Sequence, residues 1–386
     1  MIQIWKILHL GCKMKFLFII QGEGRGHLTQ AIAFSKMLEA QGHQLTGVIV
    51  GKSKRRIIPD FFIEQIPAKI HPVESPNFET DKGEKRILIG KTITKNLRKS
   101  PVYFKSLQQI DEIVKAAAPD IILNFYDLLG GLYNAFFRPK AHFWVIGHQY
   151  LIYHPSFKFA RSVAFQKELF QLNTWLTALG ADKKIALAFK PLSKIHGHKL
   201  VVAPPLLREE VKHLQPRSGN FILAYMVNPG YATEVISFAK KYPHLRIMAY
   251  WDKKNAKETE HPLPNLSFHK IHDRHFLKDM AACRGLVCTA GFESVCEALF
   301  LKKPVLVIPV KGQYEQACNA LDTVESGVGI SSKNFDFGKL ETWIASNQKT
   351  EDDFQDWAGK WNVILSQILP ETKMTEPVLE LTQSFS

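Results

Sequence analysis

The residues best suited to chemistry in this 386-residue chain lie between Leu286 and Ala320. An apolar segment there ends in a Thr-Ala-Gly turn, and a helix is predicted to begin near Gly291. The first backbone N–H groups of a helix have no partner within it and lie at the positive end of its dipole, so they stabilise a phosphate group without a metal ion. The residues that we expect around this phosphate are Thr289, Ala290, Gly291 and Phe292.

Further polar side chains follow at positions that suit the rest of a nucleotide. Glu297 lies two turns into the predicted helix, where its carboxylate would meet a ribose hydroxyl. More hydrogen-bonding groups come after the next predicted strand, at the edge where open α/β sheets bind ligands. These groups are Gln313, Glu315, Gln316 and Asn319.

A second glycine-rich turn lies near the start of the chain. The apolar run Lys15–Gln21 predicts a strand buried on both faces, and Gly22-Glu23-Gly24-Arg25-Gly26-His27 follows it. Glycines such as Gly24 and Gly26 let the backbone approach a pyrophosphate, although a tight strand-to-helix turn would use them too. The presence of a second, independent turn at Gly291 favours phosphate binding, and Arg25 would add a positive charge.

Together these segments resemble the donor-binding signature of the two-domain GT-B glycosyltransferases, which use nucleotide sugars. Within that family, the chain looks most similar to the group that includes the peptidoglycan enzyme adding N-acetylglucosamine to a lipid-linked acceptor. The resemblance covers roughly residues 14 to 345. It differs from the pattern at Glu315, where relatives carry Asp or His, and this leaves the sugar open. The matching residues are Thr289-Ala290-Gly291, Glu297, Lys303-Pro304, Pro309, Glu315-Gln316 and Asn319-Ala320.

The resemblance implies a nucleotide-sugar donor, expected to be a UDP-sugar, held between two Rossmann-like domains. In the family, the backbone at the position of Ile271 pairs with the nucleotide base. The turn Asn228-Pro229-Gly230 follows the predicted strand Phe221–Val227, so we expect Asn228 and Gly230 to contact the donor as well. The chain has no Asp-x-Asp sequence, so we expect neither a metal clamp on the diphosphate nor another cofactor.

Glycosyl transfer also needs a base that takes the proton from the acceptor hydroxyl. His27 is the first candidate, because it closes the glycine loop and an imidazole titrates near neutral pH; the family places a histidine at the same point. Asp127 and Glu23 are alternatives, and Asp127 would also be able to orient the imidazole. Direct displacement by the activated acceptor would invert the anomeric centre. The alternative is a purely structural role, in which His27 only caps or packs against the helix start.

Two other functions fit the same fold, since a fold does not fix an activity. One is a nucleotide-sugar epimerase, which would place several acids and histidines around the sugar ring. The other is a polyanion-binding protein that has lost transfer, although Glu297, Gln316 and Asn319 are all retained. Nucleic acid is not the partner that we expect.

The remaining elements predict the domain organisation. Residues 1–13 form an extension or upstream start, 14–203 an acceptor domain, 204–220 a linker and 221–350 a donor domain. A helix over 351–370 is expected to cross back to the first domain, before a loose tail at 371–386. Phe157–Leu176 shows the apolar spacing of a core helix.

The net charge of +14 is concentrated in the first half of the chain. Residues 1–203 hold 29 Lys and Arg against 14 Asp and Glu, whereas residues 204–386 are almost neutral. Lys85–Lys105 interleaves basic and apolar residues and predicts either a membrane-surface helix or a core helix with a solvated face. We therefore expect a cytoplasmic protein that binds an unknown acceptor, with a lipid-linked acceptor on an anionic membrane surface as one candidate.

Cysteines and apolar runs add two expectations. The spacing of the five cysteines fits neither a zinc nor a redox site, so we expect buried free thiols. No apolar run reaches the roughly 18 residues that span a bilayer, and Met1–Lys13 lacks the small-residue cleavage site of a secretory signal.

Overall fold

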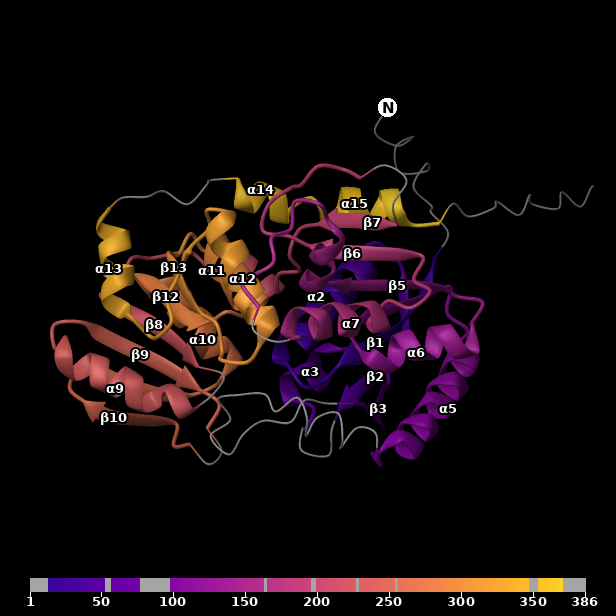
Figure 1. Cartoon of the computed structure of the whole chain (residues 1–386), viewed down its shortest axis with the longest axis horizontal. Helices are drawn as coiled ribbons and strands as arrows, with labels where there is room; N and C mark the ends of the chain where they lie inside the picture. The colour runs from indigo at the N-terminus through magenta and orange to yellow at the C-terminus, as the bar shows by residue number, and fades with distance from the viewer. Residues whose placement is uncertain are drawn as a thin grey trace, which may run out of the picture.

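The computed structural model describes residues 13–52, 57–76, 98–162, 165–195, 199–226, 229–253, 256–346 and 353–370. Within them, two seven-stranded sheets lie side by side, the first on the right of Figure 1 and the second on the left. This confirms the predicted α/β class with two Rossmann-like domains. Most of the basic segment 85–105 lies outside the described residues, so its predicted helix is described only from residue 98 onward.

The first sheet has the strand order β3-β2-β1-β4-β5-β6-β7, and all its described pairs are parallel. Its strands are β1 (Lys15–Gln21), β2 (Gln44–Lys52), β3 (Ile70–Glu74), β4 (Ile121–Phe125), β5 (His142–Gly147), β6 (Lys183–Leu187) and β7 (Leu200–Ala203). The segments between them form α2 (Arg25–Ala40), α3 (Asp60–Gln65), α5 (Ser100–Ala117), α6 (Leu128–Phe137), the 3-10 turn η1 (His148–Tyr153) and α7 (Gln166–Thr177).

The second sheet has the order β10-β11-β9-β8-β12-β13-β14, which resembles the first sheet except for the additional edge strand β10. Its pairs are parallel except for the antiparallel edge pair of β10 and β11. Its strands are β8 (Phe221–Met226), β9 (Arg246–Trp251), β10 (Thr259–Leu263), β11 (Leu266–Lys270), β12 (Gly285–Thr289), β13 (Val305–Ile308) and β14 (Ile330–Ser331). The accompanying helices are η2 (Pro229–Tyr231), α9 (Ala232–Lys241), α10 (Asp273–Ala282), α11 (Phe292–Phe300), α12 (Tyr314–Glu325) and α13 (Phe337–Ala345).

Both sheets reverse their strand order next to their first strand, β1 in one and β8 in the other. At such a switch point the loops after neighbouring strands diverge and leave a crevice in which open α/β sheets bind ligands. In the first sheet the loop after β1 leads into the first turn of α2, which carries the predicted His27, and Asp127 follows β4. In the second sheet the loop after β12 carries Gly291. These predicted site residues therefore lie at the carboxyl ends of the strands, next to the switch points, as expected.

The continuous apolar sequence of β1 is explained by burial on both faces. Phe16, Phe18 and Ile20 enter one apolar cluster, while Leu17 and Ile19 enter another on the opposite face of the sheet. All five side chains are fully buried. A strand covered by helices on both sides has no solvent face, so its sequence shows no alternation.

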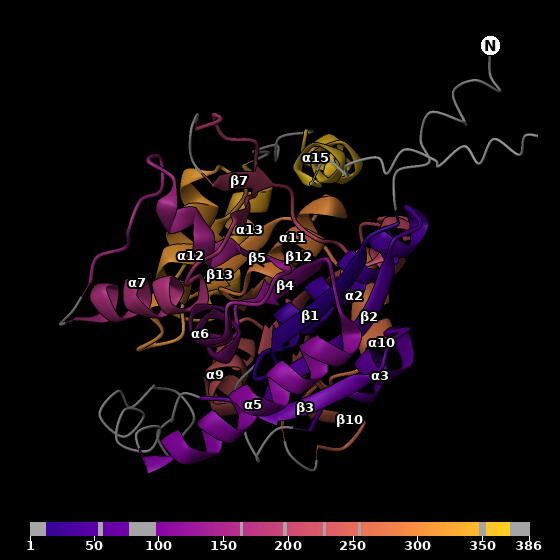
Figure 2. The same cartoon turned by 90° about the vertical axis from the view of Figure 1, so that its right-hand side faces the viewer.

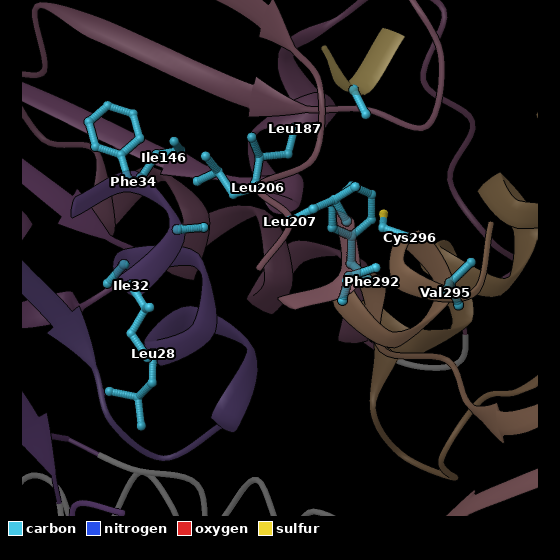
Figure 3. Packing of buried hydrophobic residues seen from close by; sticks show 14 of the residues in the cluster. Leu28, Ile32, Phe34, Ile146, Leu187, Leu206, Leu207, Phe292, Val295 and Cys296 are labelled. Atoms are coloured by element: carbon cyan, nitrogen blue, oxygen red, sulfur yellow. The ribbon is translucent and has the colours of Figure 1, made fainter. Parts of the chain in front are cut away.

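One of these clusters continues from the first domain into the second. Figure 3 shows Leu28 and Ile32 of α2 and Leu206 and Leu207 of the linker on the way to Phe292 of α11. The first half of the linker, residues 204–211, which reaches into the short helix α8 (Glu209–Lys212), is thus packed, whereas most of residues 212–220 are exposed. The two domains share apolar core on this side of the molecule.

The C-terminal segment crosses back to the first domain, as predicted, but as two short helices. They are α14 (Phe354–Ala358) and α15 (Trp361–Ile368), along the top of Figure 1. Trp361 donates from Nε1 to the Pro205 carbonyl at 3.1 Å, and its ring meets that of Phe34 in α2 at a centroid distance of 5.6 Å. The prediction of one long helix was wrong because the helix is interrupted at Gly359 and Lys360.

The expectation that Phe157–Leu176 forms a core helix was also wrong. Helix α7 starts only at Gln166, lies at the left of Figure 2, and buries Thr174 and Thr177. Phe165 and Trp175 are 77% and 53% exposed, and Leu172 is exposed too. Small hydroxyl residues occupy the buried face of α7, Phe170 packs on Tyr314, and Leu172 and Trp175 face outward.

The remaining sequence expectations concern cysteines and membrane spans. Cys283, Cys288, Cys296 and Cys318 are free and buried, as expected. Among the described residues, no helix combines the length and apolar character needed to cross a membrane.

Candidate functional site

His27 lies in the first turn of α2, because the helix begins at Arg25, three residues before the predicted start at Leu28. Its Nδ1 lies 3.2 Å from Oε1 of Gln30. An amide oxygen only accepts hydrogen bonds, so Nδ1 carries the proton and Nε2 keeps its lone pair. Burial lowers the pKa of His27 to about 4, partly offset by the bond to Gln30. The ring is therefore neutral at pH 7 and presents Nε2 as a proton acceptor.

The other face of this imidazole is covered by Tyr126, with ring centroids 5.8 Å apart. Tyr126 follows β4 and has a φ of 60°, in the left-handed region that non-glycine residues rarely adopt. Its hydroxyl bonds Thr174 of α7 at 2.7 Å. The unusual backbone at the end of β4 thus aims an aromatic ring at the candidate base, as is frequent at functional sites.

Asp127 is a completely buried helix cap. Its carboxylate accepts hydrogen bonds from the backbone N–H of Leu129 at 2.8 Å and from the Ser75 hydroxyl at 3.1 Å, and so caps α6. Burial raises its pKa to about 6, against the lowering effect of these hydrogen bonds. The described partners of the carboxylate do not include His27, whose ring is oriented by Gln30 instead. A catalytic role for Asp127 stays a prediction.

The glycines of the first loop have different surroundings. A Cβ on Gly24 would meet nothing closer than 4.0 Å, so the fold itself does not require glycine there. A Cβ on Gly26 would collide with the carboxylate of Glu293 from α11. The Arg25 guanidinium lies 5.8 Å from the ring of Phe61 in α3. Gly26 thus lies directly against the second domain.

The turn before α11 is held open by Asn319. The Asn319 side chain is buried and donates from Nδ2 to the Ala290 carbonyl at 3.0 Å. Gly291 is the N-cap of α11, and a Cβ there would have only the Thr289 carbonyl oxygen at 4.0 Å as a neighbour. The backbone at Gly291 is thus accessible, and neither sterics nor a positive φ explains the glycine.

Phe292 connects the same helix start to the first domain. Its ring stacks on His148 of η1 at a centroid distance of 4.1 Å and meets the ring of Phe189 in a tilted arrangement at 4.8 Å. Only the backbone of Phe292 remains suited to phosphate binding, since its side chain is a buried part of the domain contact.

Glu297 forms a buried ion pair that the sequence did not reveal. Its two carboxylate oxygens accept from Nε and Nη2 of Arg208 at 2.6 and 2.8 Å, and both side chains are buried. Arg208 belongs to the linker, 89 residues earlier in the chain. This bidentate pair fixes Glu297, and ribose binding would have to use the remaining lone pairs of the carboxylate.

The polar residues around the start of α12 divide their roles. Gln316 accepts from the Val310 N–H at 3.1 Å and so shapes the loop after β13. Glu315 accepts from Nε2 of Gln149 in the first domain at 2.8 Å, and burial raises its pKa. Gln313 is the N-cap residue of α12. Glu315 therefore lies at the domain boundary.

One contact across the boundary joins Gln30 and Glu293, neither of which the sequence analysis singled out. Gln30 donates from Nε2 to Oε1 of Glu293, in the first turn of α11. Together with the bond to His27, this joins the candidate base to the predicted phosphate-binding helix through one amide. The i, i+3 spacing of His27 and Gln30 was a usable signal, whereas the pairing with Glu293 depends on the tertiary fold.

The remaining predicted donor contacts lie farther along the second sheet. Ile271 directly follows β11, and Gly230 lies in η2 after β8. Both come from the carboxyl ends of their strands, as expected. Asn228 lies outside the described residues.

Two cavities of about 210 and 170 Å³ also lie between segments of the two domains. Their linings include Lys190 in both cases, with Asp322 in the first and Trp357 in the second. None of the predicted donor-site residues lines either cavity. In this structure the two sides of the predicted site are instead in contact through Gln30, Phe292 and Glu315.

The fold of this chain is similar to that of several solved glycosyltransferases. The calicheamicin glycosyltransferase CalG4 has a TM-score of 0.58 and 14% identity, over 93% of this chain and 100% of that chain. The spinosyn rhamnosyltransferase SpnG, solved with thymidine diphosphate, has a TM-score of 0.53 and 13% identity, over 92% and 96%. UGT2 of Phytolacca americana, solved with UDP-2-fluoro-glucose and pterostilbene, has a TM-score of 0.58 and 11% identity, over 92% and 93%.

At these identities the solved structures establish the GT-B fold. No curated protein sequence matches the chain. A family model does match, over residues 14–346, and it is the one described as Glycosyl transferase family 1. Since that match takes in both sheets and both glycine-containing turns, the chain belongs to glycosyl transferase family 1.

Proposed function

We propose that this glycosyltransferase moves a sugar from a nucleoside diphosphate, most plainly UDP, to an acceptor hydroxyl with inversion and without a metal ion. The observation that carries the proposal is the connection from His27 through Gln30 to the first turn of α11. A neutral imidazole with a free Nε2 lies one side chain away from a helix start suited to a diphosphate. These are the two functions that glycosyl transfer requires.

In the proposed mechanism, the donor diphosphate binds the backbone N–H groups at Gly291 and Phe292, where the helix dipole stabilises the charge that develops on departure. His27 Nε2 accepts the acceptor proton as the oxygen attacks the anomeric carbon and the bond to the diphosphate breaks. A pKa of about 4 makes His27 a weak base in the free protein. A diphosphate bound nearby raises that proton affinity, because an imidazolium is stabilised by a neighbouring anion.

Support for the donor class comes from the relatives. SpnG was solved with thymidine diphosphate and UGT2 with UDP-2-fluoro-glucose, so nucleoside diphosphates are the ligands to test first. Gly24 and Gly291 add support. A Cβ at either position would have free space in the protein alone, so close approach of a ligand would explain the glycines. We assign recognition of the sugar to Gln316 and Glu315, with hexoses and N-acetylhexosamines as the candidate sugars.

For the acceptor, we infer a lipid-linked substrate at an anionic membrane surface, as in the peptidoglycan-enzyme group that the sequence resembles. The first half of the chain holds the whole excess of positive charge. Its helix α7 exposes Leu172 and Trp175, the N-cap residue Phe165 before it is exposed too, and Phe136 at the end of α6 is 73% exposed. Basic charge with exposed aromatic side chains suits an anionic lipid surface.

The transfer activity is tested by incubating the full chain with UDP-sugars and dTDP-sugars, after thermal-shift screening for the donors that stabilise it. A ligand at ~100 times its Kd stabilises by about 2.7 kcal/mol. His27→Ala should bind the chosen donor normally but lose roughly 10²- to 10⁴-fold in turnover. A His27→Ala protein that transfers sugar at the wild-type rate would rule out this base.

The membrane inference needs its own measurement. The full chain should sediment with anionic phosphatidylserine vesicles and not with phosphatidylcholine vesicles, and salt should release it. Leu172→Ser with Trp175→Ser should weaken the binding, whereas Val324→Ser, an exposed apolar residue of the second domain, serves as the matched control. Equal sedimentation with both kinds of vesicle would contradict the inference.

An epimerase remains a second candidate because of one observation. Glu293, Glu297 and Glu315 lie close enough to one another for each negative charge to affect the Glu293 carboxyl. Such a cluster of acids would suit a reaction on the sugar ring itself. Donor turnover in the absence of any acceptor, with the sugar released as its epimer, would favour this alternative over transfer.

A further inference from the structure

The carboxyl group of Glu293 lies at the place where the proposed function puts a donor phosphate. Glu293 is in the first turn of α11, and its carboxylate accepts a hydrogen bond from its own backbone N–H. It is also pressed against Gly26 of the first domain. A carboxylate at the N-terminus of a helix is stabilised by the same N–H groups and dipole that would bind a phosphate. In this structure the side chain of α11 supplies that anion itself.

The carboxyl group is held in place across the domain boundary. Gln30 of α2 donates its amide N–H to Oε1 of Glu293. The neighbouring charged groups are Glu297 on the same helix and Glu315 on α12, both acidic, and burial together with these charges raises the pKa of Glu293 to about 7. On α2, the His27 ring is neutral at pH 7. The Arg208 guanidinium forms its bidentate pair with Glu297.

We propose that nucleotide-sugar binding is coupled to proton uptake by Glu293, whose carboxylate takes the place of a donor phosphate in the donor-free protein. The inference rests on the proposed function. An ionised carboxylate and a phosphate at one helix start would repel each other at short range in a site shielded from water. Once protonated, the carboxyl group changes from an anion that competes with the phosphate into a donor, whose O–H bonds a phosphate oxygen.

This coupling predicts how donor affinity depends on pH. In the donor-free protein Glu293 loses its proton near pH 7, so above that pH each donor molecule must bring one proton with it. Linkage then lowers the affinity by about tenfold for each further pH unit, or about ninetyfold between pH 6 and pH 9. Glu293→Gln keeps the shape and the hydrogen bond to Gln30 but has no charge to neutralise. Its affinity should be pH-independent over this range and higher than that of the wild type at pH 9.

The experiment is titration calorimetry of the full chain with UDP-glucose, UDP-N-acetylglucosamine and dTDP-glucose. Nucleotide sugars are chosen because their phosphates do not titrate in this pH range, unlike the terminal phosphate of UDP. Measurements at pH 8 in two buffers with different ionisation enthalpies should show the uptake of about one proton per donor in the wild type and none in Glu293→Gln. Glu325→Gln is the matched control, since Glu325 also pairs across the boundary, with Lys158, but away from α11. It should behave like the wild type.

Different results identify which idea fails. If the wild type binds a nucleotide sugar with equal affinity at pH 6 and pH 9, or if Glu293→Gln keeps the pH dependence, the coupling is refuted while the proposed function survives. If none of the three donors binds either protein at any pH, the proposed function fails and the coupling fails with it. A Gln30→Ala variant tests whether the charge of Glu293 is the cause. Donor affinity should still depend on pH in this variant, because the Glu293 carboxyl remains. A Gln30→Ala protein whose donor affinity no longer depends on pH would refute the electrostatic explanation.

Discussion

Replacing Asp127 by Asn separates the structural role of this side chain from the predicted catalytic one. The carboxylate caps α6, accepts from Ser75 and is completely buried. Asn has the same shape and is itself a good N-cap residue, so the cap is kept. What the substitution removes is the negative charge, which burial makes unfavourable.

The size of the effect follows from the pKa of Asp127, which burial raises from 3.8 to about 6. Because the folded state holds the proton more tightly, the wild type is favoured at low pH and loses stability as the pH rises from about 4 through 6. The complete shift corresponds to about 3 kcal/mol, and the part that falls between pH 4.5 and pH 7.5 is about 2 kcal/mol. Asp127→Asn is free of this loss. Its stability relative to the wild type should therefore increase by about 2 kcal/mol between pH 4.5 and pH 7.5.

The assay is urea unfolding of both proteins at the two pH values, followed by tryptophan fluorescence, to which the fully buried Trp144 of β5 in the same domain contributes. Transfer activity is measured on the same samples. If Asp127 only caps α6, Asn should preserve turnover, whereas an orienting or basic role should cost roughly 10²- to 10⁴-fold. A variant that is destabilised equally at both pH values would refute the assignment of a costly buried charge.

Substitutions at three further positions, two of them with a control variant, test the proposed donor site and the stability of its surroundings. Gly291→Val fits the extended backbone and free space at this N-cap, so it should fold but lose nucleotide affinity, whereas Gly291→Ser should retain much of it; unchanged UDP affinity in a folded Val variant would exclude this site. Glu297→Gln removes the negative charge that balances the buried Arg208, so it should lower the free energy of unfolding by about 3–5 kcal/mol, as measured by thermal unfolding. The control is Glu325→Gln, which should cost less than about 1 kcal/mol because the ion pair of Glu325 is more exposed. Gln316→Ala should weaken the binding of a UDP-sugar without affecting that of UDP, and equal losses for both would reassign the residue.

Much of the fold was predictable because its signals are local. The buried strand Lys15–Gln21 has the bounds expected from its apolar run, and the turn at Gly291 precedes a helix as its sequence predicts. By contrast, β10 at the antiparallel edge is mostly exposed and contains a proline, so its sequence carries neither an apolar run nor clean alternation. The outward face of α7 was misjudged because exposed aromatic residues have the same spacing as buried ones.

The candidate site was predictable only in part for a related reason. The glycines and His27 were predicted because each lies at a turn or a helix start, and Glu297 was predicted from its distance along the helix from Gly291. The partners that tune them come from elsewhere in the chain: Arg208 reaches Glu297 from the linker, and Gln30 meets Glu293 at a separation of 263 residues. Ionisation behaviour depends on such partners and on burial, so it becomes accessible only with the tertiary structure.

The two connections between the domains restrict how the proposed donor site can open. The chain passes from the first domain to the second through the packed linker and returns through α14 and α15, and both crossings adjoin the apolar cluster shown in Figure 3. Pulling the domains straight apart would expose that cluster to water at both crossings. A rotation that uses the cluster as its pivot would separate Gln30 from Glu293 while leaving most of it buried. We therefore expect the domains to open by a hinge rotation whose axis passes near this apolar cluster.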